Sequence, residues 1–340
     1  SFASTFAVAQ YRAVAGYQAG DGFSWSGSGT FGTWPTGGNA SNFPFPDTGV
    51  ALEYIQGVLW TFDATSSRPW RPTTEADETR AFLPIEGVDI EVGAAGREAV
   101  VKTQSGGMLI GHDRTIRRIA GLDLQLVQNR DFELAAKALT AAELAQAKVW
   151  SYRDGSKEFV GFNIGLERCF VFDLDTGLWH ERTRHASDAY DIDFATTAFG
   201  EADVIVGATS SPYLWKLDAD VMTDDGDPIL REFTVHAPVA GDIPIDDIVL
   251  DFEFYGQPAQ GQGSSPTISI EVSVDNGSSW SEPRILALPM LGQYGERVRT
   301  DGSFGMSTAE AGCLIRGKLG HPIKMSGYGV WINPTADEVP

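Results

Sequence analysis

Glycine and aromatic side chains are unusually frequent in this sequence, and together they restrict the folds available to it. The 340 residues include 38 Gly, 9 Trp, 9 Tyr and 19 Phe, whereas long segments of helical periodicity are scarce. Glycine permits tight turns, and large flat side chains are favoured in strands. The sequence therefore predicts an all-β protein of short strands joined by tight loops, as in sandwiches, barrels and propellers.

Several segments alternate apolar and polar residues with the period of two that half-buried strands require. Residues 88–92 and 122–126 show this alternation clearly. Residues 51–62 predict one apolar strand that stops in a turn at Asp63, and the proline-rich stretch at 71–74 predicts a loop. Further strands, the first two forming a hairpin, are predicted at 107–113, 115–119, 149–152, 159–162, 250–254 and 268–274.

One helical segment interrupts the predicted strands. Asp131 is expected to cap a short helix that runs through Leu139. Thr140 and Glu143 have the spacing of a capping box, which predicts the start of a second short helix.

An internal similarity favours repeated sheets. Residues 59–65, followed by Trp70, resemble residues 170–179, because in each case an apolar strand enters an Asp/Thr turn and a Trp follows. Short strands at nearly regular spacing favour radial or stacked sheets over βαβ units. We therefore predict a β-propeller with a short helical insertion and a β-rich C-terminal segment.

The pattern of the sequence changes near residue 236, where Pro238 and the pair Gly241-Asp242 predict a domain boundary. The propeller body is expected to span residues 1–235, and its Gly/Trp-rich start at 1–85 looks divergent. Residues 236–340 are expected to form a last β layer on the body or a small sandwich beside it.

The charge of the chain limits its partners. The formal net charge is -21 at pH 7. Such a surface repels phosphate and loses the counterion release that drives ordinary nucleic-acid binding. The charge argues against a sequence reader or a DNA packager. It suits a channel through which DNA must slide, because acidic walls do not hold the passing duplex.

Metal, disulfide and membrane signals are weak. Cys169 and Cys313 lie far apart and match no metal spacing, so buried free thiols are expected. No apolar run is long enough to cross a bilayer, and the start lacks the basic-then-apolar pattern of a signal peptide. Scattered histidines argue against a zinc site; they are His112, His180, His185, His236 and His321. No cofactor and no metal are expected.

Residues 273–280 match the Asp-box pattern S-x-D-x-G-x-x-W, whose defining residues are Ser273, Asp275, Gly277 and Trp280. The pattern predicts a hairpin in which Asp275 accepts backbone N–H bonds, Gly277 takes a positive φ and Trp280 packs back over the turn. Asp-boxes occur in sialidases and other glycoside-handling propellers, away from the catalytic centre. We therefore interpret this motif as a fold element.

A sialidase would also need an arginine cluster, an Asp that acts as the catalytic acid and a Tyr–Glu nucleophile pair. The sequence contains Glu53 beside Tyr54, and it contains several arginines, among them Arg68, Arg71, Arg182 and Arg184. Any acidic chain of this length would contain as much. No catalytic residue is assigned, and the chain is not expected to be an enzyme.

Two further motifs have local explanations. The G-x-G-x-x-G match at 27–32 continues into Thr33-Trp34-Pro35, which cannot open the helix of a dinucleotide site. The Asp-rich stretches at 173–177 and 223–227 lack the downstream Glu of a calcium-binding EF-hand. The first of these is interpreted as a solvated turn, in which Asp173, Asp175, Gly177 and the following Trp179 are structural residues.

Three stretches together resemble the packaged-DNA stabilisation, or tail nozzle, proteins of short-tailed bacteriophages. Residues 140–159 are similar to a helix-then-strand passage of that family. Residues 172–182, FDLDTGLWHER, resemble its "YD..TGLWHER" element and are the most specific match. Residues 273–330 follow its order of Asp-box turn, "YG.RV.W" element and closing strand. One departure is that residues 300–305 replace a basic, aromatic strand found in many family members.

This resemblance covers roughly residues 85–332 and implies a structural part of the virion tail. The family forms rings, which implies a hexamer of this chain at the tail end of the portal–adaptor column. The implied partners are other copies of the chain, portal or adaptor proteins, tail needle or fibre proteins, and double-stranded DNA that passes without sequence-specific binding. No catalytic residue, cofactor or membrane insertion is implied.

Two alternatives stay open at this point. One is a carbohydrate-binding or sialidase-like propeller that acts in host-surface recognition. The other is a distal tail or baseplate protein of a long-tailed phage or phage-like particle.

Overall fold

The protein is described by a computed structural model, in which the chain forms two compact units. The first unit comprises residues 1–183 and 187–218, and the second comprises 184–186 and 219–340. The description covers residues 3–9, 12–17, 22–29, 34, 47–73, 81–127, 129–165, 168–183, 190, 192–198, 203–208, 211–218, 221, 223–224, 227–238, 244–245, 247–255, 267–288, 298–300, 302–308, 312–320 and 324–333.

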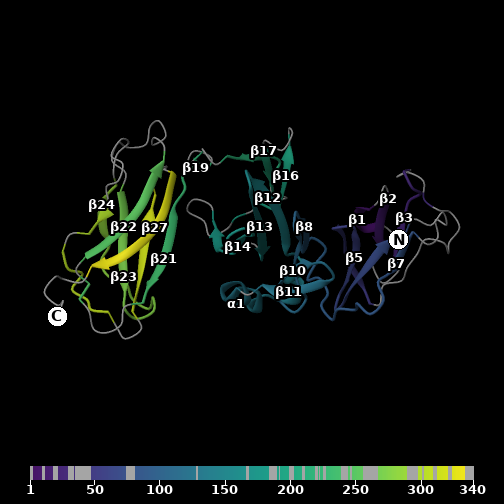
Figure 1. Cartoon of the computed structure of the whole chain (residues 1–340), viewed down its shortest axis with the longest axis horizontal. Coiled ribbons are helices and arrows are strands. Elements are labelled where there is room, and N and C mark those ends of the chain that lie inside the picture. Colours follow the sequence, from purple (N-terminus) through teal and green to yellow (C-terminus); the bar gives the residue numbers. More distant parts are fainter. Residues whose placement is uncertain are drawn as a thin grey trace. The chain divides into compact units, whose positions relative to one another are not determined.

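Within the described residues, the first unit contains five small antiparallel sheets that follow one another along the chain (Figure 1). In each sheet the hydrogen-bonded neighbours are also neighbours in sequence, as in propeller blades, so we number the sheets blades 1 to 5. Blade 1 consists of β1 (Ala3–Ala9), β2 (Arg12–Tyr17) and β3 (Phe23–Trp25). Blade 2 consists of β4 (Gly49–Ile55), β5 (Val58–Asp63), β6 (Ser67–Pro72) and β7 (Phe82–Pro84).

The remaining three blades repeat this up-and-down order. Blade 3 consists of β8 (Val100–Thr103), β9 (Gly106–Ile110), β10 (Ile116–Ala120) and β11 (Asp123–Val127). Blade 4 consists of β12 (Lys148–Asp154), β13 (Lys157–Ile164), β14 (Arg168–Asp173) and β15 (Trp179–Arg182). Blade 5 consists of β16 (Phe194–Ala198), β17 (Asp203–Gly207) and β18 (Leu214–Leu217).

The blades pack on one another through their first strands. β1 packs against β4, β4 against β8, β8 against β12, and β12 against β16. The aromatic side chains of Trp25, Trp60, Phe162 and Trp150 contribute to the buried clusters between successive blades. Because extensive packing of β16 on β1 is absent among the described strands, the series is open. The predicted all-β, propeller-type fold is confirmed.

Two short helices lie between blades 3 and 4, where the helical insertion was expected. In α1 (Arg130–Ala138) the N-cap is Asn129, whose side chain accepts the backbone N–H of Phe132 at 2.9 Å. The prediction that Asp131 caps this helix is wrong, because Asp131 lies inside the first turn. In α2 (Ala141–Leu144) the capping box of Thr140 and Glu143 is confirmed.

Three predictions for residues 51–92 are wrong. Residues 51–62 form a hairpin, because Gln56 and Gly57 have φ of 48° and 85° and turn the chain between β4 and β5. Residues 71–72 belong to β6 rather than to a loop, since they pair with β7. Residues 88–92 make a single bridge, Ile90 to Ser67, because this segment leaves blade 2 towards blade 3.

The other predicted strands of the first unit are confirmed. The hairpin at 107–119 is formed by β9 and β10, and the strand at 122–126 corresponds to β11. The similar segments 59–65 and 170–179 lie in different blades, and they also occupy different places within those blades. The first joins the second and third strands of blade 2, and the second joins the third and fourth strands of blade 4.

The second unit is a sandwich of two antiparallel sheets around one apolar core. One sheet is ordered β21-β26-β23-β24 and the other β25-β22-β27. Ile248, Leu250, Ile270, Val272 and Ile315 lie in the core between them. The strands are β21 (Arg231–Ala237), β22 (Asp247–Tyr255), β23 (Thr267–Ser273), β24 (Arg284–Ala287), β25 (Val298–Arg299), β26 (Cys313–Leu319) and β27 (Lys324–Asn333), and a short pair, β19 (Thr223–Asp224) and β20 (Asp227–Pro228), precedes them.

The division between the units falls after Asp218 rather than at residue 235, because β21 is an edge strand of the sandwich. The boundary pair Gly241-Asp242 lies outside the described residues. Cys169 and Cys313 are both free and buried, as expected, and they belong to different units. In the part of the chain that is described, no helix has the length and apolarity needed to span a membrane.

Candidate functional site

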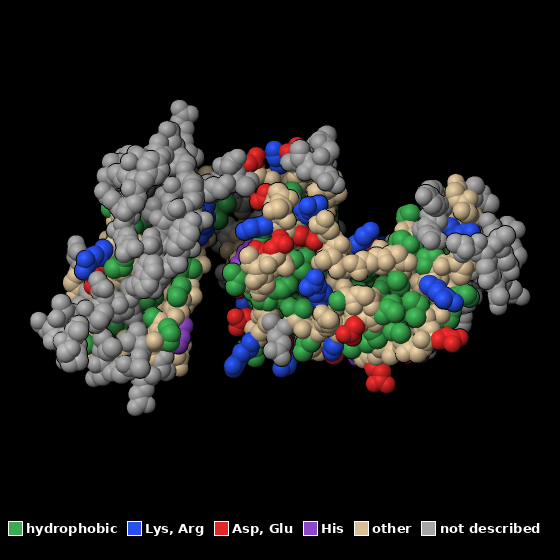
Figure 2. Space-filling model, in the orientation of Figure 1, with side chains coloured by type: hydrophobic (Ala, Val, Ile, Leu, Met, Phe, Trp, Pro, Cys, Tyr) green, Lys and Arg blue, Asp and Glu red, His purple; other side chains and the backbone are tan. Residues whose placement is uncertain are grey.

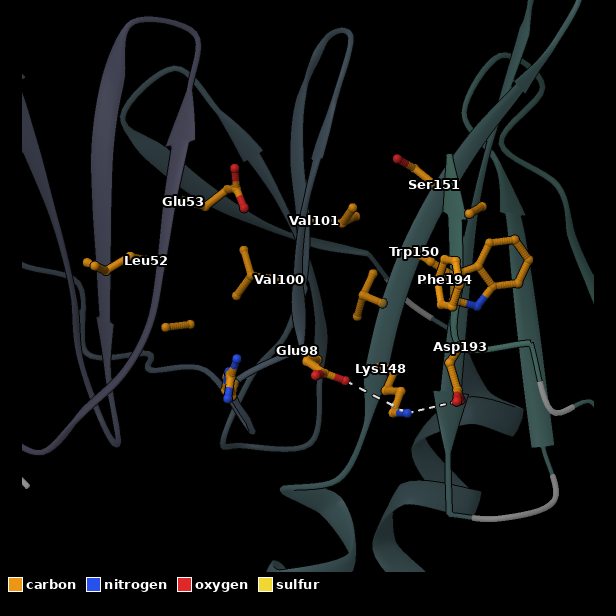
Figure 3. A pocket seen from close by; sticks show the side chains of 14 residues that line it. Leu52, Glu53, Glu98, Val100, Val101, Lys148, Trp150, Ser151, Asp193 and Phe194 are labelled. Atoms are coloured by element: carbon orange, nitrogen blue, oxygen red, sulfur yellow. Dashed lines mark ion pairs between the residues drawn. The ribbon is translucent and has the colours of Figure 1, made fainter. Parts of the chain in front are cut away.

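The first strands of blades 2 to 5 border a cavity of about 500 Å³ within the first unit (Figure 3). Its walls combine apolar side chains, among them Leu52, Val100, Val101 and Phe194, with charged ones. The other lining residues are Ala51, Glu53, Arg97, Glu98, Lys148, Val149, Trp150, Ser151, Asp193 and Ala195. The volume of this cavity is within the range of small-molecule sites.

One side of the cavity carries an ion-pair chain. The Lys148 ammonium group lies 2.9 Å from an Asp193 carboxylate oxygen and 3.8 Å from a Glu98 oxygen (Figure 3). These three residues come from β12, from the segment before β16 and from the segment before β8, so the packing of three blades creates the chain. No sequence motif links them, and the sequence reasoning did not single them out.

Figure 2 shows one face of the molecule, on which charged side chains of both signs are interspersed with exposed apolar ones. This pattern is that of an ordinary solvated surface. The described residues hold no cluster of three or more His, Cys, Asp or Glu side chains that could bind a metal ion.

The turn at 173–177 is organised by the carboxylate of Asp173. One Asp173 oxygen accepts the backbone N–H groups of Asp175 at 2.9 Å and Thr176 at 3.1 Å. Burial acts to raise the pKa of Asp173, but hydrogen bonds from Thr176 outweigh it and hold the pKa below its usual value. Gly177 adopts φ of 72°, and Asp175 accepts the backbone N–H of Glu158 at 3.1 Å, which ties the turn to β13.

Strand β15, which follows this turn, is held inside blade 4. The Trp179 ring lies 4.6 Å from the Phe172 ring, measured between centroids. Glu181 accepts two hydrogen bonds from Arg168, at 2.7 and 2.8 Å. Arg182 donates to the hydroxyl group of Tyr152. The side chains of the element that most resembles the tail nozzle family therefore serve the internal scaffold.

The neighbouring thiol is inert. Cys169 is fully buried beside Arg182, and desolvation raises the pKa of its thiol to about 12. A thiol with so high a pKa is not ionised at neutral pH, so it is a packing residue rather than a nucleophile.

The Asp-box turn lies in the sandwich, between β23 and β24. The Ser273 hydroxyl group donates to Asp275 at 2.7 Å and accepts the backbone N–H of Gly277, which has φ of 86°. Hydrogen bonds from the Ser279 side chain and backbone lower the pKa of Asp275 to about 2. The Arg316 guanidinium lies 3.9 Å from the centre of the Trp280 ring. The motif is thus outside the propeller-type unit.

The arginines considered for a sialidase do not converge on the cavity. Arg68, on β6, forms an ion pair with Asp89 at 2.6 Å, and Arg71 lies on the same strand. Arg182 belongs to β15 in blade 4. Arg184, His185 and His321 lie outside the described residues, as do residues 289–297, which include all of the "YG.RV" element except Val298. Of the described arginines, Arg97 lines the cavity.

Comparisons with known proteins add little. No family model matches the chain, and no curated protein matches it. Among solved structures, it is similar to the Dos1 propeller, with 11% identity, a TM-score of 0.33, and coverage of 59% of this chain and 51% of that one. It is also similar to the extracellular domain of the putative one component system BT4673 from B. thetaiotaomicron, with 10% identity, a TM-score of 0.37, and coverage of 87% and 40%.

A third similar structure is PorZ, a bacterial surface component of the type-IX secretion system of Porphyromonas gingivalis, with 11% identity and a TM-score of 0.34. That match covers 82% of this chain and 32% of PorZ. The chain thus spans between a third and a half of the length of these structures. At such low TM-scores the similarities carry no argument, so the propeller-type class rests on the order and packing of the blades themselves.

Proposed function

We propose that this chain is a structural, non-catalytic subunit of a bacteriophage tail, of the nozzle or adaptor type. In this role it extends the DNA exit channel and helps to retain the packaged DNA. The ring is formed by copies of the chain, six by analogy with the family that the sequence resembles. Portal or adaptor proteins and tail needle or fibre proteins are its neighbours.

The observation that carries this proposal is that the side chains of residues 172–182 make their contacts within blade 4. This segment is the most specific match to the family, and its polar side chains bind other residues of blade 4. A binding or catalytic element would instead direct such groups towards a cavity. The contacts of Trp179, Glu181 and Arg182 within blade 4 support a role in shape and assembly.

The charge of the chain supports the same role. With a net charge of -21, the protein repels the DNA backbone, so the duplex can slide without being held. In this proposal, retention of the genome depends on closure of the channel by partner proteins rather than on DNA binding. Weak DNA binding at physiological salt is therefore an expected property of the isolated chain.

The experiment is to locate the chain and to count its copies. Electron cryomicroscopy of the particles that contain it should place a ring of this chain in the tail, with a negatively charged bore. Native mass spectrometry of the purified chain should detect a ring-sized oligomer. A lone monomer in intact particles, or saturable binding of the chain on a glycan array, would contradict the proposal. The second result would favour the carbohydrate-binding alternative.

A further inference from the structure

Glu53 occupies an unusual position on the wall of the cavity. It lies on β4 on the same face as Ala51 and Ile55, which are buried between blades 2 and 3. Its cross-strand neighbour is Trp60, which is fully buried. The carboxylate therefore stands where most neighbouring positions are apolar, and Figure 3 shows it beside the cavity, on the opposite side from Lys148.

The partners of Glu53 are weak compared with those of the other carboxylates in the cavity. Among the described residues, it accepts the backbone N–H of Tyr54 at 3.3 Å and is attracted by Lys102, with which it makes no described ion pair. Glu98 and Asp193, by contrast, share the ammonium group of Lys148. Lys148 thus neutralises the carboxylates on one side of the cavity, whereas Glu53 makes no described ion pair, although Arg97 also lines the cavity.

A carboxylate in this environment favours a cationic ligand. Burial removes water from Glu53 and raises its pKa, which means that the charged form is destabilised. An ammonium group placed beside it would compensate for this cost by forming a charge-assisted hydrogen bond. Val100, on the neighbouring strand β8, lines the cavity next to Glu53 and suits a short methylene chain.

We propose that this cavity binds an aliphatic ammonium group, with Glu53 as its counter-ion and the side chain of Val100 packed on its methylene groups. Free alkyl amines and lysine side chains of a partner peptide share this chemistry. The proposal is independent of the structural role proposed above, because it requires only the first unit and neither a ring nor DNA.

The test is a titration of the full chain, by isothermal calorimetry at low salt, with 1,5-diaminopentane and with the peptide acetyl-Gly-Lys-Gly-amide. At least one probe should bind saturably, and the tighter of the two identifies the source of the ammonium group. The substitution Glu53→Gln should weaken binding about tenfold, the usual effect of losing one charge-assisted hydrogen bond. Glu91→Gln, which changes an exposed carboxylate outside the cavity, should alter binding less than about twofold.

A second variant changes the neighbouring strand β8 instead of Glu53. Val100→Lys introduces a cation of the chain's own beside Glu53 and should abolish binding, whether or not Glu53→Gln folds well. Neutral 1-pentanol should not compete. The proposal is overturned if neither probe binds, if pentanol binds as well as the diamine, or if Glu53→Gln and Val100→Lys both retain the affinity of the original chain.

Discussion

The carboxyl group of Asp63, at the end of β5, is buried without full compensation. The residue is 1% exposed, and one of its oxygens has no hydrogen-bond partner among the described residues. The other oxygen accepts the hydroxyl group of Ser66 at 3.0 Å. Desolvation raises the pKa of Asp63 to about 6, against the lowering effect of the Ser66 hydrogen bond. Replacing Asp63 by Asn should therefore stabilise the first unit at neutral pH.

The magnitude follows from proton linkage. The folded pKa of about 6 lies above the unfolded value of 3.8, so the folded state binds the proton more tightly. The destabilisation is fully present above pH 6 and largely disappears as the pH falls towards 4. A shift of about two units corresponds to about 3 kcal/mol at pH 7, of which about half is recovered at pH 5.

The assay is urea unfolding of the original chain and of Asp63→Asn at pH 7, 5 and 4, followed by tryptophan fluorescence. The variant should be more stable at pH 7 by up to about 3 kcal/mol, and the difference should shrink to about 0.5 kcal/mol at pH 4. Asp123→Asn, at an exposed position on β11, is the control and should leave the pH dependence unchanged. A stability difference between Asp63→Asn and the original chain that is the same at pH 7 and pH 4 would refute the reasoning.

Two further substitutions test the packing of each unit. Gly161→Ala would place a Cβ atom 2.3 Å from the Trp150 ring, so thermal unfolding of the first unit should show a loss of about 1–3 kcal/mol, and an unchanged transition would contradict this packing. Glu271 pairs with Arg316 at 2.9 Å and Lys318 at 3.1 Å, and the hydrogen bond from Arg316 lowers its pKa. Glu271→Gln should destabilise the sandwich by about 1–3 kcal/mol at pH 7. This difference should fade as the pH falls through the carboxyl range, whereas a pH-independent difference in urea unfolding would argue against the ion pairs.

Local features of this protein were predictable from the sequence. The capping box at Thr140, the hairpin at 107–119 and the turn at 173–177 depend on hydrogen bonds and backbone angles within a few residues. Such features are set mainly by the residues that form them. The turn at Gln56-Gly57 belongs to the same class, but the apolar run on both sides of it obscured the signal.

The tertiary structure alone decided how these local pieces are combined. Residues 88–92 alternate like a strand, yet they form a single bridge, because a strand also needs a neighbour with free backbone groups. The cavity joins Glu53, Lys148 and Asp193 from three different blades, and no spacing in the sequence predicts that encounter. Alternation and turn chemistry act over a few residues, so the sequence by itself determined the capping box, several turns and most of the strands. The order of the blades, the open series and the separation of Glu53 from the Lys148 ion pairs arise from packing between distant segments.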